Sequence, residues 1–307
     1  MRNYTKIFAS IFCQILIFLS VIIDAQGQDY LSSSQYIDNL TPINAAYSLL
    51  NNNGLITNSL KKQWNNLPGS PTTWTFSAQL PLESITGSTG LFLMDSQFAV
   101  EHLTEVNAFF AKSAQLSENL HLGVAINAGM RKYVANYSSL DNANDPLFIN
   151  DVRQNQPNVG FSVLLYNNNF YLGLSMPQFS IKSLGTASVD DVNYFKNRYN
   201  ISAACILNVS KGVQFKPAGV FTYINGTPLL YQVSGTFYFN RLLGMGLDIR
   251  SNNRAASILS MGMDNFRINY SYQFGLATSN FNVSNFSNHE ISISYYFGKH
   301  FNEHNIL

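Results

Sequence analysis

The strongest pattern in the chain is an alternation of apolar and polar residues with a period of two. Over residues 266–274, every second residue is aromatic or Ile, and the residues between them are polar. A similar alternation covers residues 229–239 and 291–297. A period of two is typical of a β-strand with one apolar and one polar face, so the pattern predicts an all-β protein.

We expect about fourteen strands, and the lengths of their connections carry independent information. The predicted spans are 57–64, 72–80, 88–95, 103–116, 120–134, 157–166, 169–177, 197–208, 213–224, 228–239, 242–250, 255–263, 265–274 and 289–298. We number the connections along the chain, the first joining the first two strands. The even-numbered connections are mostly tight, whereas the three longest are all odd-numbered; they are 135–156, 178–196 and 275–288. Bacterial outer-membrane barrels have short periplasmic turns and longer outer loops. This segregation favours a transmembrane antiparallel β-barrel over a soluble β-sandwich, the alternative fold.

Composition agrees with a barrel in the outer membrane. Only 11% of the residues are charged, against about 25% in an average soluble domain. The mean hydropathy of −0.02 is nevertheless too low for a helical membrane protein. A barrel reconciles the two values, because apolar residues that face outward alternate with polar residues that face inward and the average hydropathy cancels. We therefore expect outer-membrane lipid as a partner of the outward face. A net charge of +1 without clustered Lys and Arg argues against nucleic acid.

The N-terminus has the features of a cleaved signal peptide for export. Arg2 and Lys6 precede an apolar run over 7–23, and Ala-Gln-Gly at 25–27 is a small-x-small cleavage site. We expect removal of 1–27, with an uncleaved signal anchor as the alternative. Cys205 would then be the only cysteine, which excludes an intramolecular disulfide.

The rest of the chain divides into three parts. Residues 28–56 lack clean alternation, so we expect them to plug the lumen or reach a periplasmic partner. Residues 57–298 form the predicted barrel, and 299–307 form a periplasmic tail.

No pattern in the sequence indicates an enzyme, since no nucleophile, base and orienting group converge in a recognisable motif. His300 and His304 have metal-compatible spacing, but they lie in the predicted tail and are expected to be solvated. Aspartates in two predicted outer loops are candidates for calcium ligands, with a hydrated loop as the preferred interpretation. They are Asp141, Asp145, Asp151, Asp190 and Asp191. We therefore predict no enzyme, no cofactor and no metal site.

Several motifs occur in a specific order along the chain. The first motif is Gln35-Tyr36, followed by Pro42-Ile43-Asn44-Ala45-Ala46-Tyr47. The second is Lys62-Gln63-Trp64, followed by Gly69-Ser70-Pro71-Thr72-Thr73 and Gln79-Leu80-Pro81-Leu82. The third, in the C-terminal part, consists of Phe215-Lys216-Pro217, Gly246-Leu247-Asp248-Ile249-Arg250, Tyr270-Ser271-Tyr272 and His289-Glu290-Ile291-Ser292. This set resembles the PorP/SprF family of membrane proteins, associated with type IX secretion in Bacteroidetes-type bacteria. Ala45 stands where that family usually has proline, Ser48 where alanine is expected, and Lys62 where arginine is usual.

The resemblance implies a non-enzymatic role in the type IX secretion and gliding system. Such a barrel would assist secretion or surface attachment of a specific partner, an adhesin-like cargo protein, together with components of the secretion machinery. The candidate partner-binding residues are Gln35, Tyr36, Asn44, Tyr47, Lys62, Trp64 and Pro71. For Trp64, packing in the barrel rim is the alternative. Two other functions stay open: a channel for small or hydrophobic solutes, and a structural barrel that anchors periplasmic machinery.

Overall fold

A computed structural model describes residues 36, 38–64, 68–140, 150–180, 196–276, 287–298 and 306–307. The predicted signal peptide, Gln35, His300 and His304 lie outside these residues, as do four of the loop aspartates, Asp141, Asp145, Asp190 and Asp191. None of the helices in the described ranges is both long and apolar enough to cross a membrane.

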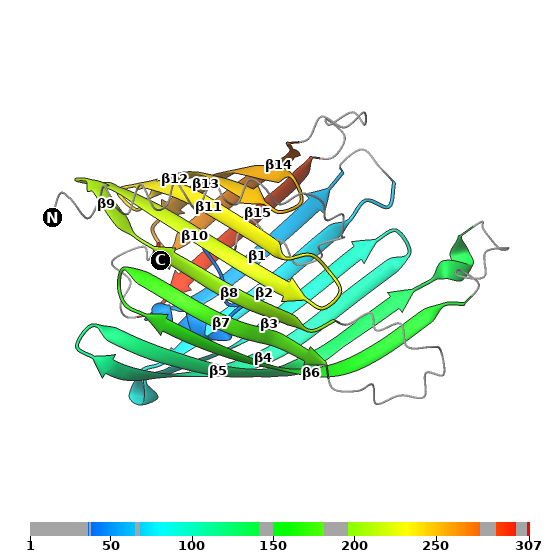
Figure 1. The fold of residues 1–307 in the computed structure, drawn as a ribbon, viewed down its shortest axis with the longest axis horizontal. Coiled ribbons are helices and arrows are strands. Elements are labelled where there is room, and N and C mark those ends of the chain that lie inside the picture. The colour runs from blue at the N-terminus through cyan, green and yellow to red at the C-terminus, as the bar shows by residue number, and fades with distance from the viewer. Residues whose placement is uncertain are drawn as a thin grey trace.

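The chain forms a closed antiparallel β-barrel, as the alternation predicts (Figure 1). The strands are β1 (Gly54–Gln63), β2 (Thr72–Leu82), β3 (Gly87–Phe98), β4 (Glu101–Ser117), β5 (Leu120–Ala135), β6 (Val152–Tyr166), β7 (Phe170–Ser180), β8 (Arg198–Cys205), β9 (Leu207–Ser210), β10 (Val213–Ile224), β11 (Leu230–Phe239), β12 (Leu243–Arg250), β13 (Arg254–Met263), β14 (Phe266–Gly275) and β15 (Asn288–Phe297). Three short 3-10 helices are η2 (Ala45–Leu50), η3 (Glu83–Ile85) and η4 (Tyr137–Ser139).

The barrel closes where β15 pairs with β1, with Phe297 opposite Gly54. Both β8 and β9 pair with β10, so they are two parts of one strand interrupted at Ile206. Counted in this way, the barrel has 14 strands, and the predicted count is confirmed.

Two strands begin at least three residues earlier than the sequence pattern predicts. β1 starts at Gly54 rather than 57, and β6 starts at Val152 rather than 157. The extra residues of β6 pair along β5, up to Val152 opposite Ala135. Cross-strand backbone pairing extends these strands where the residues show no apolar alternation, so the pattern alone missed them.

The two faces of the wall are inverted relative to a soluble protein. On β14, the outward residues Phe266, Ile268, Tyr270 and Tyr272 are 36–47% exposed, whereas the inward residues Arg267, Asn269, Ser271 and Gln273 are 1–3% exposed. Soluble proteins rarely expose a continuous apolar surface, but a barrel in lipid requires one around a polar interior. The exposure pattern is therefore that of a transmembrane barrel.

The connections differ between the two ends of the barrel. One end, which we call the long-loop end, carries the connections 136–151, 181–197 and 276–287; the other, the short-turn end, has connections such as 118–119, 211–212 and 264–265. β1 starts and β15 finishes at the short-turn end. The first strand therefore begins, and the last strand ends, at the kind of end that faces the periplasm in bacterial barrels.

Candidate functional site

The N-terminal segment lies inside the barrel, in the half nearer the short-turn end. We call Tyr36 and residues 38–50 the plug. Its helix η2 contacts β2, β3, β4, β5 and β6 (Figure 1, blue). The buried plug residues are Tyr36, Leu40, Thr41, Asn44, Ala45, Ala46, Tyr47 and Ser48. The plug and the barrel wall therefore share one core, which includes Phe109, Leu164 and Tyr171 of the wall.

Asn44 both shapes the plug and attaches it to the wall. Its side-chain oxygen accepts a hydrogen bond of 3.1 Å from Ala46 N and so caps η2, a role that asparagine suits well. Its side-chain nitrogen donates to the backbone oxygen of Val163 on β6 at 3.2 Å. The backbone nitrogen of Ala45 donates to Ser162 Oγ at 3.1 Å. Asn44 and Ala45 together thus fix the start of η2 against β6.

Other hydrogen bonds attach the plug to distant parts of the wall. The hydroxyl of Tyr36 lies 3.1 Å from Ser234 Oγ on β11. Thr41 Oγ1 donates to Gln79 Oε1 on β2 at 3.0 Å. Because β2 and β11 are far apart in the strand order, the plug spans the lumen.

Two glycines let the plug approach the wall closely. A Cβ atom on Gly123 of β5 would lie 2.6 Å from the Leu49 side chain, and one on Gly173 of β7 would lie 2.6 Å from Asn44 Nδ2. Larger residues would occupy the space of the plug at both positions.

Tyr47 is the largest side chain of η2 and is almost fully buried. Its ring contacts Tyr171 edge to face, with 5.5 Å between ring centroids, and its hydroxyl donates to the backbone oxygen of Leu307. Burial raises the pKa of Tyr47, and that of Tyr36, well above the usual value of 10.0. Both phenols therefore stay protonated at neutral pH.

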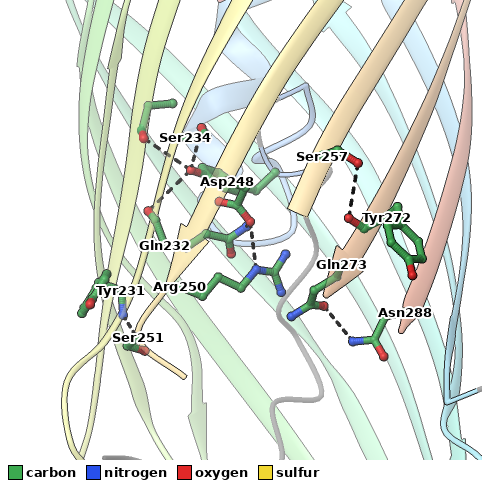
Figure 2. Close-up of polar contacts among 12 residues, drawn as sticks. Tyr231, Gln232, Ser234, Asp248, Arg250, Ser251, Ser257, Tyr272, Gln273 and Asn288 are labelled. Atoms are coloured by element: carbon green, nitrogen blue, oxygen red, sulfur yellow. Dashed lines mark hydrogen bonds and ion pairs between the residues drawn. The ribbon is translucent and has the colours of Figure 1, made fainter. Parts of the chain in front are cut away.

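Buried polar side chains fill the lumen nearer the long-loop end. On one wall, Gln178 Nε2 donates to Glu105 at 2.7 and 2.8 Å, and Arg131 Nε lies 3.4 Å from Glu105. On another, Asp248 Oδ2 accepts hydrogen bonds of 2.9 Å from both Arg250 Nε and Gln232 Nε2 (Figure 2).

Five of these six side chains are almost fully buried. Glu105, Arg131, Gln178, Asp248 and Arg250 are each at most 4% exposed. Almost none of their surface is open to water, so the lumen is closely packed around these side chains. Among the described residues, no group of three His, Cys, Asp or Glu side chains is arranged to hold a metal ion.

The structure separates the predicted partner-binding residues into two groups. Tyr36, Asn44 and Tyr47 come together in the plug. Lys62, Trp64 and Pro71 lie at the long-loop end of β1 and β2, where Gln63 N donates to the Pro71 oxygen at 2.9 Å. Trp64 is half-buried and packs edge to face on Phe98 of β3, with 5.9 Å between ring centroids. This contact matches the alternative expectation for Trp64, packing in the barrel rim.

Sequence reasoning missed the lumen charges and the plug-facing glycines. Inward parity along β4, β5 and β12 could have placed Glu105, Arg131 and Asp248 in the lumen. The same parity places Arg250, two residues after Asp248, on the same face of β12. The pairing of Glu105 with Arg131 depends on the register of β4 with β5. The contacts of Gly123 and Gly173 depend on where the plug lies, which no local signal shows.

Solved structures of outer-membrane proteins resemble the chain at a low level. The Pseudomonas putida toluene transporter TodX is 10% identical with a TM-score of 0.47, covering 89% of this chain and 96% of its own. The Acinetobacter baumannii outer membrane protein Omp33 is 6% identical with a TM-score of 0.45, covering 80% and 98%. Likeness at this level carries no argument about function. No curated protein matches the chain.

A family model gives the assignment. The model described as type IX secretion system membrane protein PorP/SprF matches residues 25–295. This range includes the plug and all strands up to most of β15. The chain therefore belongs to the PorP/SprF family of type IX secretion system membrane proteins, as its sequence motifs suggested.

Proposed function

We propose that the protein is a closed, non-enzymatic barrel of the outer membrane that assists secretion or surface attachment of one adhesin-like cargo protein. The filled lumen carries the proposal. The plug hydrogen-bonds to β2, β6 and β11, and the charged side chains beyond it are buried. A barrel that conducts solutes needs a continuous aqueous path. A filled lumen therefore favours binding at the two ends over passive transport through the middle.

The ends of the barrel differ in what they offer a partner. In the orientation that loop length favours, the long-loop end faces outward and would meet the cargo. Lys62, Trp64 and Pro71 belong to this rim. The plug enters from the opposite end, where it would transmit contacts with the periplasmic secretion machinery through Tyr36, Asn44 and Tyr47. Export through a cleaved signal peptide at 1–27 completes the proposal.

Deletion of the gene tests this proposal. We expect one surface protein to disappear or be degraded, while viability and general permeability stay nearly normal. The measurement is a quantitative surface proteome of the deletion strain and of a strain complemented with the wild-type gene. A normal surface proteome combined with lost uptake of a small solute would contradict the proposal and favour the channel instead.

A further inference from the structure

The lipid-facing wall carries more positive charge at one end than at the other. Among the described strand residues, the exposed outward Lys and Arg side chains near the long-loop end are Lys62 on β1, Lys132 on β5 and Arg153 on β6. Lys112 on β4 is the counterpart at the short-turn end, and it donates to the backbone oxygen of Ile85. Asp95 is an outward carboxylate on β3, but it bonds His102 and Thr104.

Lys62 lies directly opposite His289 in the pairing of β1 with β15. Both side chains are on the lipid face, because their neighbours Lys61 and Glu290 are buried on the lumen face. Directly opposed residues have Cβ atoms about 4.5–5.5 Å apart. Two groups that can carry positive charge are thus held side by side, and none of the ion pairs in the described part of the chain includes either of them.

Tyr270 and Tyr272 surround His289 on the same face. The Tyr270 hydroxyl lies 2.8 Å from His289 Nδ1, and the Tyr272 ring centroid lies 5.1 Å from that of His289. When Tyr270 donates to Nδ1, Nε2 carries the imidazole proton and is the donor left for a ligand. Exposed tyrosines of a barrel gather at the depth of the lipid headgroups. Lys62 and His289 therefore present donors at that depth.

We infer that Lys62 and His289 bind the phosphate of a lipid headgroup in the leaflet at the long-loop end. A phosphate oxygen accepts short, charge-assisted hydrogen bonds from an ammonium and from an imidazole N–H. It also places a negative charge beside the Lys62 ammonium, which is in none of the ion pairs of the described residues. Tyr270 is a positioning residue that orients the His289 ring.

Native mass spectrometry of the full-length barrel in neutral detergent tests this site. The probes are diphosphoryl lipid A, phosphatidylglycerol and inorganic phosphate. We expect both lipids to bind the wild type, and Lys62→Gln to weaken binding roughly fivefold, the effect of one basic residue near a charged membrane surface. Lys62→Arg should retain binding, because it keeps the charge. Lys112→Gln is the matched control at the other end and should bind as the wild type does.

The relative affinity of the two lipids identifies the source of the phosphate, and either order supports the site. Tyr270→Phe should weaken lipid binding while the barrel stays folded and heat-modifiable in a detergent gel. If Lys62→Gln does not assemble, His289→Gln provides the same comparison. Equal binding by wild type and Lys62→Gln, an equal loss in Lys112→Gln, or inorganic phosphate binding as tightly as the lipids would overturn the inference.

Discussion

The hydroxyl of Tyr36 lies 3.1 Å from the Oγ atom of Ser234, a residue 198 positions later in the chain. This contact joins the N-terminal segment to β11 on the inner wall of the barrel. Together with the bonds of Asn44 to β6, it makes the plug a bridge across the lumen.

The position of η2 can be tested by a disulfide between the plug and the wall. A Cβ atom on Gly123 would lie 3.6 Å from the Ala46 Cβ, within the range of about 3.5–4.5 Å that disulfides require. The nearest atom to that Cβ, at 2.6 Å, is the flexible end of the Leu49 side chain, which can move aside. In a background with Cys205→Ala, the pair Ala46→Cys and Gly123→Cys should therefore crosslink under mild oxidation. The measurement is a mobility shift in a non-reducing gel.

The matched control for this crosslink uses the next residue of β5. Val124 is 48% exposed and faces lipid, so Ala46→Cys with Val124→Cys should not crosslink. Equal crosslinking of both pairs, or of neither, would show that η2 does not lie against β5 as described.

Electrical conductance depends on the plug. In planar bilayers, we expect the wild type to pass almost no steady current, because the plug and the buried charges beyond it fill the lumen. Deletion of residues 36–50 should produce open events while the variant remains heat-modifiable, since the strand pairings do not include the plug. Steady wild-type current that the deletion leaves unchanged would count against the plug as the barrier.

Alkaline pH should loosen the plug. Burial holds the pKa of Tyr36 and Tyr47 well above 10.0, so the folded state keeps these protons after the unfolded segment has lost them. The stabilisation is therefore complete below about pH 10 and falls as pH rises above that value. Protease cleavage within 36–50 should increase between pH 9 and about pH 11. The increase should be smaller in the Tyr36→Phe, Tyr47→Phe double variant; an identical pH profile would assign the effect to other groups.

The orientation of the barrel follows from connection length. A cysteine at position 144, in the predicted outer loop but outside the described residues, should react with an impermeant thiol reagent on whole cells. A cysteine at Asn168, in the turn between β6 and β7, should react only after lysis. Cys205 is first replaced by alanine. Labelling at Asn168 alone on whole cells would mean that the barrel is inverted.

Trp64→Ala distinguishes rim packing from partner contact. The ring pair with Phe98 contributes about 0.5–1.5 kcal/mol in typical proteins, so we expect a lower unfolding temperature in detergent and less barrel in the outer membrane. Trp64→Phe, which keeps an aromatic ring, should recover most of the stability. Normal barrel level and stability combined with lost cargo at the surface would instead identify Trp64 as a contact residue.

Alternation and connection length alone predicted the class of fold and most strand positions. The residues of β14 illustrate the reason: the side chains of a strand alternate between two faces, and lipid outside with a polar lumen inside imposes opposite polarity on those faces. This constraint is local, so it is readable one strand at a time. The prediction from alternation was wrong at the start of β6, because backbone pairing with β5 extends that strand where its residues do not alternate in polarity.

Tertiary structure decided what occupies the lumen. Tyr36, Asn44 and Tyr47 stood out in the sequence only through a family motif, and neither their burial nor their partners Ser234, Val163 and Leu307 are encoded within a few residues of them. The same holds for Lys62 and His289, which become neighbours only when β1 pairs with β15. Barrel closure brings the first and last strands together, and the register of that closure is a property of the whole sheet.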